Sequence, residues 1–190
     1  MEKFDLVIVG VGGQGTLLTS KILGQVAMAE GYMVKVSEIH GMSQRGGSVI
    51  THVRVGEDVY APLVAIGKAD FLIGFEVLET ARASLFLKAS GIVITSIQQI
   101  LPMPVIIGAA VYPPQPLACF TQRVEKVDAL TLARDAGSTK AVNLVMLGML
   151  SRHLCFPADT WKQVIASTVP KETYHVNLAA FEMGAGYEQK

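Results

Sequence analysis

The fold is decided near the start of the chain, at Leu6-Val7-Ile8-Val9-Gly10-Val11-Gly12-Gly13-Gln14-Gly15, which continues into Thr16-Leu17-Leu18. The apolar run predicts a buried strand, the glycines a tight turn, and the residues from Thr16 the start of a helix. This order favours anion binding, because glycines without Cβ let backbone N–H groups approach a phosphate and the helix dipole attracts negative charge. The glycines are also compatible with a purely structural role, in which they allow the strand to pack tightly against the helix.

A second glycine-rich segment, His40-Gly41-Met42-Ser43-Gln44-Arg45-Gly46-Gly47, follows an apolar strand predicted over Met33 to Ile39. The carboxyl ends of parallel strands meet at one edge of a sheet, so we expect the two glycine loops to form one binding surface. Arg45 carries a planar cation suited to phosphate or carboxylate, and the neighbouring glycines leave it unobstructed. The alternative is a structural arginine that pairs with a carboxylate under a turn.

The composition predicts a single domain, residues 1–190, that packs against another subunit. A chain of 190 residues can bury a full core. With 51% hydrophobic and only 17% charged residues, part of its apolar surface is expected to be covered by a partner. The 16 basic residues balance the 16 acidic residues, so no net field recruits nucleic acid or an anionic membrane.

Neither the cysteines nor the N-terminus points to a metal site or to export. Cys119 and Cys155 are far apart and form no C-x-x-C pair, so we expect any iron–sulfur cluster to lie on a partner. The start, Met1-Glu2-Lys3-Phe4-Asp5, lacks the features of a signal peptide. The apolar stretch from Ile100 to Val111 contains proline and glycine and is too short to span a bilayer. These features predict a cytoplasmic protein without membrane contact.

Strands and helices are predicted to alternate through the first half of the chain. Apolar residues recur at helical spacing from Leu17 to a stop at Gly31. Residues 48–55 alternate in polarity, and a turn at 56–58 with a return through Val59-Tyr60 predicts a β-hairpin. A buried strand is expected over Phe71 to Phe75, followed by a helix over residues 76–82 and another strand from 92 to 95.

Proline and capping residues organise the second half. Five prolines between Ser96 and Phe120 exclude a long helix or a central strand, so short strands and an edge loop are expected there. A strand over residues 123–127 is followed by helices capped by Asp128 and Ser138, the second reaching residue 153. Two shorter helices, over 160–168 and 173–184, complete the chain. These elements predict an α/β fold, a Rossmann-like three-layer αβα domain with a mostly parallel mixed sheet.

Three motifs together resemble the gamma subunit or domain of 2-oxoacid:ferredoxin oxidoreductases, and within that family the small subunit of the indolepyruvate branch. They are the first glycine turn, the segment from His40 to Val49, and Val127-Asp128-Ala129 leading to Ala141-Val142-Asn143 and Leu147-Gly148. Many pyruvate-type members have an acidic residue before the arginine. Here Ser43-Gln44 stand in that place, which favours the indolepyruvate branch or a broad-specificity relative.

The resemblance implies a role in oxidative decarboxylation. A 2-oxoacid is decarboxylated on thiamine diphosphate, electrons leave through 4Fe–4S clusters to ferredoxin, and the acyl group passes to coenzyme A. The family places thiamine diphosphate and the clusters on a large partner subunit, so this chain is expected to bind neither and to be inactive alone. Ferredoxin is an indirect partner, and homodimerisation of the isolated chain stays open. Coenzyme A phosphates are expected on the amides of Gly12 to Gly15, with Arg45 neutralising their charge.

Twelve residues make up the expected binding site for this cofactor, and no catalytic residue or metal ligand is assigned. They are Gly10, Gly12, Gly13, Gln14, Gly15, His40, Gly41, Gln44, Arg45, Gly46, Gly47 and Asn143. For His40 and Asn143 a structural hydrogen bond is the alternative to ligand contact. Glu38 lies where a dinucleotide enzyme places its ribose acid, although a solvated or paired carboxylate is the competing interpretation. An independent NAD-binding oxidoreductase and an assembly subunit without a ligand are therefore the alternative functions.

Overall fold

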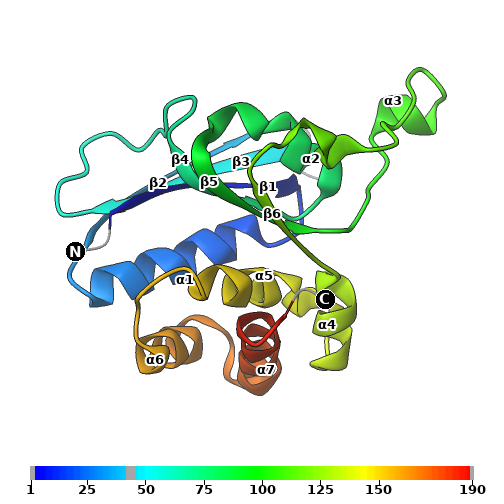
Figure 1. Ribbon diagram of the computed structural model, residues 1–190. Helices are drawn as coiled ribbons and strands as arrows, with labels where there is room; N and C mark the ends of the chain where they lie inside the picture. Colours follow the sequence, from blue (N-terminus) through cyan, green and yellow to red (C-terminus); the bar gives the residue numbers. More distant parts are fainter. Residues whose placement is uncertain (1–2, 42–45, 189–190) are drawn as a thin grey trace.

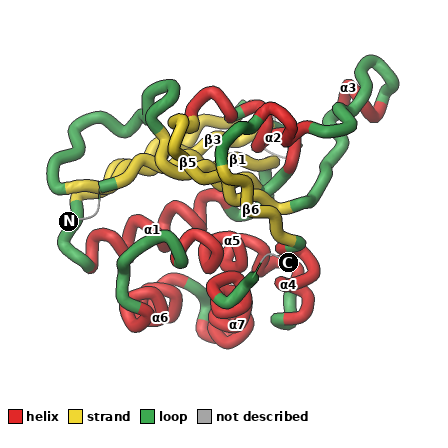
Figure 2. The backbone as a smooth tube through the Cα atoms, in the orientation of Figure 1, coloured by secondary structure: helices red, strands yellow, loops and turns green. Residues whose placement is uncertain are grey.

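A six-stranded mixed sheet organises the protein in a computed structural model that describes residues 3–41 and 46–188 (Figure 1 and Figure 2). The order of strands across the sheet is β2-β3-β1-β4-β5-β6. The strands are β1 (Phe4–Val11), β2 (Met33–His40), β3 (Ser48–Gly56), β4 (Ala69–Gly74), β5 (Leu87–Ser96) and β6 (Arg123–Val127).

Most neighbouring strands are parallel, and β3 supplies the antiparallel part. The pairs β1–β4, β4–β5 and β5–β6 are parallel, whereas β3 runs antiparallel to both β1 and β2. Because β3 runs antiparallel to both of its neighbours, β2 runs in the same direction as β1. Both strands therefore end at the same edge of the sheet. The predicted return strand at Val59-Tyr60 is wrong: β2 and β1 already occupy both edges of β3, and residues 57–68 form a loop.

Helices cover both faces of the sheet, as the predicted fold class requires. They are α1 (Thr16–Ala29), α2 (Val77–Arg82), α3 (Met103–Ile106), α4 (Ala129–Asp135), α5 (Val142–Ser151), α6 (Ala158–Thr168) and α7 (Tyr174–Ala185), with short 3-10 turns η1 (Ser84–Phe86), η2 (Pro116–Cys119), η3 (Thr139–Ala141) and η4 (Lys171–Thr173). Figure 1 shows α1 and α5 against one face and α2 on the other. Helices α6 and α7 pack on α1 and α5 and form a layer outside them.

The core lies on both sides of β1. Leu6 and Ile8 join the cluster between the sheet and the larger helical layer, while Val7 and Val9 join the cluster on the opposite face. All four side chains are buried. Alternate side chains of a strand point to opposite faces, so this continuous apolar run is the pattern of a central strand covered on both sides. The strand predicted from the sequence is confirmed.

Two element boundaries differ from the predictions. Strand β5 starts at Leu87 rather than Ile92, and Gly91 lies inside it where the register against β4 shifts between Ala69 and Phe71. The long helix predicted from Ser138 is divided into η3 and α5. The Ser138 side chain does cap the first turn, by accepting a hydrogen bond from the Lys140 N–H at 3.2 Å.

The segment between β5 and β6 contains short helices instead of the predicted short strands. Pro102 precedes α3, and its carbonyl accepts hydrogen bonds from Val105 and Ile106. Proline suits such a position because it has no N–H to leave unpaired and its φ is already helical. Figure 1 shows α3 standing away from the body of the protein. Exposed Met103, Ile106 and Ile107 make this projection apolar.

Candidate functional site

The glycine turn after β1 has a backbone that requires glycine at two positions. Gly13 and Gly15 have φ values of 102° and 84°, in the left-handed region that other residues rarely adopt. Gly15 is also the N-cap of α1. The Gly12 N–H donates to the Gly47 carbonyl at 2.9 Å and the Gln14 N–H to the Val11 carbonyl at 3.2 Å. The N–H groups of Gly13 and Gly15 have no acceptor among the described residues, which narrows the expected anion site to these two amides.

Gln14 braces the turn with its side chain. Its Oε1 accepts a hydrogen bond from the Val11 N–H at 2.7 Å, and its Nε2 donates to the Phe75 carbonyl and to Gln98 Oε1, both at 3.2 Å. A Cβ on Gly10 would lie only 2.8 Å from Gln14 Oε1, so Gly10 is needed for the amide to fold back. Gln14 and Gly10 therefore support the turn. The hydrogen bonds of Gln14 also connect the ends of β1, β4 and β5.

The second glycine segment meets the first at the carboxyl edge of the sheet. The bond from Gly12 to Gly47 joins them directly, and the Gly41 N–H donates to the Ser48 carbonyl at 3.5 Å. Gly46 has a positive φ of 77°. The expected juxtaposition of the two loops is therefore confirmed for the residues described. Gln44 and Arg45 lie outside the described residues, so their expected roles stay predictions.

A cavity of about 410 Å³ opens where the two loops meet. Its walls include the glycine turn, Leu17 on α1, and Glu38 and His40 at the end of β2. Glu38 accepts a hydrogen bond from the Thr51 hydroxyl at 3.2 Å, and His40 Nδ1 lies 3.1 Å from the Gly41 carbonyl. Both side chains thus have a local partner and also face the cavity. The positively polarised start of α1 favours an anionic group in this cavity, whereas the Glu38 carboxylate opposes one.

Asn143 lies on the other side of the glycine turn. It sits in the first turn of α5 with 4% of its surface exposed, and a Cβ on Gly15 would be 3.2 Å from its own Cβ. It lines a second cavity of about 460 Å³ together with Gly13, Gln14 and Gly15. The structure therefore brings Asn143 to the turn, as the sequence analysis expected, but into a cavity distinct from that of Glu38 and His40.

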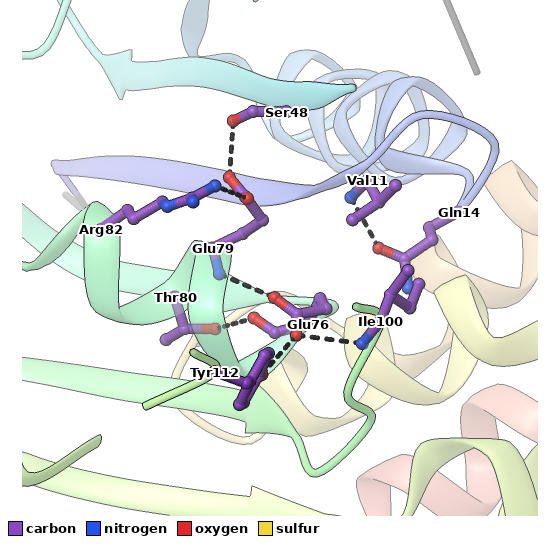
Figure 3. A network of polar contacts seen from close by, with 9 residues as sticks. All are labelled: Val11, Gln14, Ser48, Glu76, Glu79, Thr80, Arg82, Ile100 and Tyr112. Carbon is purple, nitrogen blue, oxygen red and sulfur yellow. Dashed lines mark hydrogen bonds and ion pairs between the residues drawn. The ribbon is translucent and has the colours of Figure 1, made fainter. Parts of the chain in front are cut away.

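A buried carboxylate network beside the turn was missed from the sequence (Figure 3). The Glu76 carboxylate is 1% exposed and accepts hydrogen bonds from the Glu79 N–H at 2.8 Å, the Ile100 N–H at 3.2 Å and the Tyr112 hydroxyl at 2.7 Å. Burial, and then the Glu76 carboxylate, raise the pKa of Tyr112. These bonds hold residues 100 and 112 at the base of the projecting α3 segment.

Glu79 extends this network toward the glycine loops (Figure 3). It accepts hydrogen bonds from the Ser48 hydroxyl and from Arg82, each at 2.5 Å. From the sequence, Glu76 and Glu79 were interpreted only as residues of a predicted helix. The signal that could have identified the network is that this helix directly follows a buried strand, at the edge where ligands bind in α/β sheets.

No group of three or more His, Cys, Asp and Glu side chains is placed to hold a metal ion within residues 3–41 and 46–188. In the same residues, no helix has the length and apolar character needed to cross a membrane.

Comparisons with known proteins agree on one family. The pyruvate ferredoxin/flavodoxin oxidoreductase family matches residues 5–187. Indolepyruvate oxidoreductase subunit IorB of Thermococcus kodakarensis is 43% identical over 97% of this chain and 95% of its own length. The gamma subunit of a keto/oxoacid ferredoxin oxidoreductase from Geobacter sulfurreducens has a TM-score of 0.72 at 21% identity, with 95% of each chain covered.

A further solved structure has the same fold inside a larger chain. The 2-oxoglutarate:ferredoxin oxidoreductase of Magnetococcus marinus, solved with 2-oxoglutarate, coenzyme A and succinyl-CoA bound, has a TM-score of 0.76 at 18% identity. The match covers 97% of this chain and 31% of the other.

Proposed function

The chain belongs to the pyruvate ferredoxin/flavodoxin oxidoreductase family, and we propose from this that it works beside a larger catalytic subunit and helps to bind coenzyme A. It is a small subunit of the indolepyruvate or 2-oxoacid type, and so a component of an oxidoreductase. In this proposal the larger subunit holds thiamine diphosphate and the 4Fe–4S clusters. The thiamine cofactor supplies the decarboxylation chemistry, ferredoxin takes the electrons, and coenzyme A accepts the acyl group.

The meeting of the two glycine loops is the observation that carries the coenzyme A proposal. The amides of Gly13 and Gly15 stand at the start of α1 without an acceptor among the described residues, beside a cavity of about 410 Å³. Amides arranged in this way at a helix start bind phosphate groups well. Arg45 is proposed to neutralise part of the charge. The fold shared with an oxidoreductase that was solved with coenzyme A bound supports the same assignment.

The cysteines of this chain do not fit a cluster. Cys119 lies in η2 and Cys155 follows α5, and both thiols are exposed. A 4Fe–4S cluster takes four cysteine ligands, and the described residues bring no such group together. We therefore propose that electron transfer does not pass through this chain. Its residues bind and orient the acyl acceptor, and Gln14, Gly10 and Glu76 hold the loops that do so.

Gly13 offers a direct test with a matched control. In the complex with the larger subunit, Gly13→Ala is expected to raise the KM for coenzyme A about tenfold, because a Cβ there displaces the ligand phosphate and disturbs the amide direction. Gly31→Ala introduces the same backbone strain at the far end of α1, since its φ is 86° and nothing lies near its Cβ either. The control is expected to lower stability similarly, by roughly 1 kcal/mol, and to leave the KM unchanged.

Circular dichroism and urea unfolding of both variants check folding. An unchanged KM in a folded Gly13→Ala complex, or equal increases in both variants, would contradict coenzyme A binding at the turn.

A further inference from the structure

The projecting segment that contains α3, residues 101–111 and here called the arm, is both exposed and free of charge. Between Lys88 and Arg123 the sequence contains no Asp, Glu, Lys, Arg or His, whereas 17% of all residues in the chain are charged. Four large apolar side chains of the arm are between 61% and 90% exposed: Met103, Ile106, Ile107 and Val111. An exposed apolar surface without charge is typical of the centre of a protein–protein interface.

The arm keeps its shape through its own backbone hydrogen bonds. The Pro102 carbonyl accepts from the Val105 N–H at 2.9 Å, and the Pro104 carbonyl accepts from the Ala109 N–H at 2.8 Å. Figure 1 shows the arm away from the sheet and from the other helices. A segment that is already ordered loses little conformational freedom when it binds, so the arm presents its apolar side chains ready for a partner.

Glu76 fixes the base of the arm at the edge of the sheet where the candidate site lies (Figure 3). Its carboxylate accepts hydrogen bonds from the Ile100 N–H at 3.2 Å and from the Tyr112 hydroxyl at 2.7 Å, and these two residues flank the arm. Ile100 also lines the cavity of about 460 Å³ beside the glycine turn. A protein that holds the arm must therefore stand over this edge.

A groove of about 430 Å³ continues the uncharged surface at the base of the arm. Gln99, which precedes the arm, and Pro114, which follows it, both line this groove together with Leu117 of η2. Lys126 is the one charged side chain among the described residues of its walls. The arm and the groove together form a projection and an adjoining hollow, as a docking surface requires.

We propose that the arm docks into an apolar cleft of the larger catalytic subunit. This inference rests on the proposed function, in which that subunit holds the thiamine cofactor. An acyl acceptor bound at the glycine turn has to reach this cofactor, so the larger subunit must approach the edge from which the arm projects. A second copy of this chain on the arm would block that approach and bring no cofactor. Because the arm offers no charge, a charge in the cleft would be buried without a partner, and the cleft is expected to have none.

Ile107→Glu tests the docking against a matched control. Titration of the larger subunit with the chain is expected to show affinity at least tenfold weaker, because docking would bury the new carboxylate in an apolar cleft. Ile66→Glu makes the same change where the side chain is 71% exposed, compared with 69% for Ile107. Ile66 lies in the loop between β3 and β4, at the opposite edge of the sheet, and its variant is expected to keep the wild-type affinity. Unchanged affinity in Ile107→Glu, or equal losses in both variants, overturns the proposal.

Hydrogen exchange tests the same contact without a substitution. Amides of residues 101–111 are expected to exchange more slowly when the larger subunit is bound, while those of residues 57–68 keep their rate. Equal rates across the arm in the free chain and in the complex contradict the docking. Urea unfolding of the isolated variants provides the folding control, and both are expected to be about as stable as the wild type because both side chains are exposed.

Sedimentation of the isolated chain distinguishes the larger subunit from a second copy. The wild type and Ile107→Glu are expected to have the same mass in solution. If instead the wild type is a dimer that Ile107→Glu dissociates, while affinity for the larger subunit is unchanged, a second copy covers the arm and the proposal is wrong.

Kinetics of the complex separate this inference from coenzyme A binding. Ile107→Glu is expected to raise the concentration of larger subunit that gives half-maximal turnover, and to leave the KM for coenzyme A unchanged once the complex is saturated. Gly13→Ala is expected to do the reverse. If Ile107→Glu assembles normally while Gly13→Ala raises the KM, the docking is wrong and the proposed function stands. If Ile107→Glu impairs assembly while Gly13→Ala leaves the KM unchanged, coenzyme A binding at the turn is wrong and the docking stands.

Discussion

At the scale of single residues, His52 is a buried group whose protonation is coupled to folding. It is 3% exposed in β3, its Nδ1 accepts a hydrogen bond from the Val64 N–H at 3.3 Å, and its ring packs edge-on against Phe86. Burial lowers the pKa of His52 below its usual 6.5. Below that value the unfolded chain binds a proton that the folded chain resists, so stability must fall with the pH.

Urea unfolding between pH 7.5 and 5.5 measures this effect. The free energy of unfolding is expected to decrease below pH 6.5, with a contribution from His52 of at most about 1.4 kcal/mol per pH unit. His52→Gln is expected to be less stable at pH 7.5 but to have a shallower pH dependence, because Gln does not titrate. An identical slope in the wild type and the variant would show that the acid sensitivity comes from another group.

At the scale of elements, the crossing of α5 and α7 requires glycine on both helices. A Cβ on Gly148 would lie 2.1 Å from the Phe181 carbonyl oxygen, and a Cβ on Gly184 would lie 2.1 Å from that of Val145. The two helix backbones therefore touch, which keeps α5 in place with Asn143 at its start. Neither backbone can move aside as a flexible side chain would, so this crossing depends on both glycines.

Gly148→Ala is expected to lower the free energy of unfolding by about 3 kcal/mol, because the methyl group forces the two helices apart. Gly24→Ala provides the control within a helix. Its Cβ would lie 3.5 Å from Val34 Cγ1, an ordinary contact, so the change is expected to stabilise α1 by roughly 0.5–1 kcal/mol. Thermal or urea unfolding compares them, and a small loss in Gly148→Ala would mean that the helices separate easily.

The elements that the sequence predicts well are those with local signals. The capping residue Asp128 and the glycine stop at Gly31 define α4 and α1, and the structure confirms both. The hairpin at Val59-Tyr60 failed because strand pairing is decided by edges far apart in the sequence: β1 and β2 occupy both sides of β3. The role of Glu76 was missed because its partners Ile100 and Tyr112 are also distant in the sequence and contact it only in the folded chain.

At the scale of the whole molecule, the residues of the candidate site lie at one edge of the sheet. Loops after β1, β2, β4 and β5 converge there, and the glycine turn stands between two cavities. Two patterns of a strand followed by a glycine-rich loop were enough to predict the shared edge. They could not reveal the second cavity, because its far wall is formed by α5 packing on Gly15, a contact between residues 15 and 143. The sequence placed Asn143 near the glycine-rich edge of the sheet, but it did not predict the contact with Gly15.

The isolated chain is expected to lack the cofactors that the reaction needs. Oxidative decarboxylation of a 2-oxoacid needs an electron sink at the carbonyl carbon and a relay for single electrons, and we propose that both belong to the larger subunit. The isolated chain is therefore expected to reduce no dye acceptor when given indolepyruvate or pyruvate with coenzyme A. Adding the larger subunit with its cofactors is expected to restore turnover, and the larger subunit alone is expected to show a much lower rate with coenzyme A. Turnover by the isolated chain, with iron and thiamine analyses that exclude a contaminating partner, would instead place a complete catalytic site within these 190 residues.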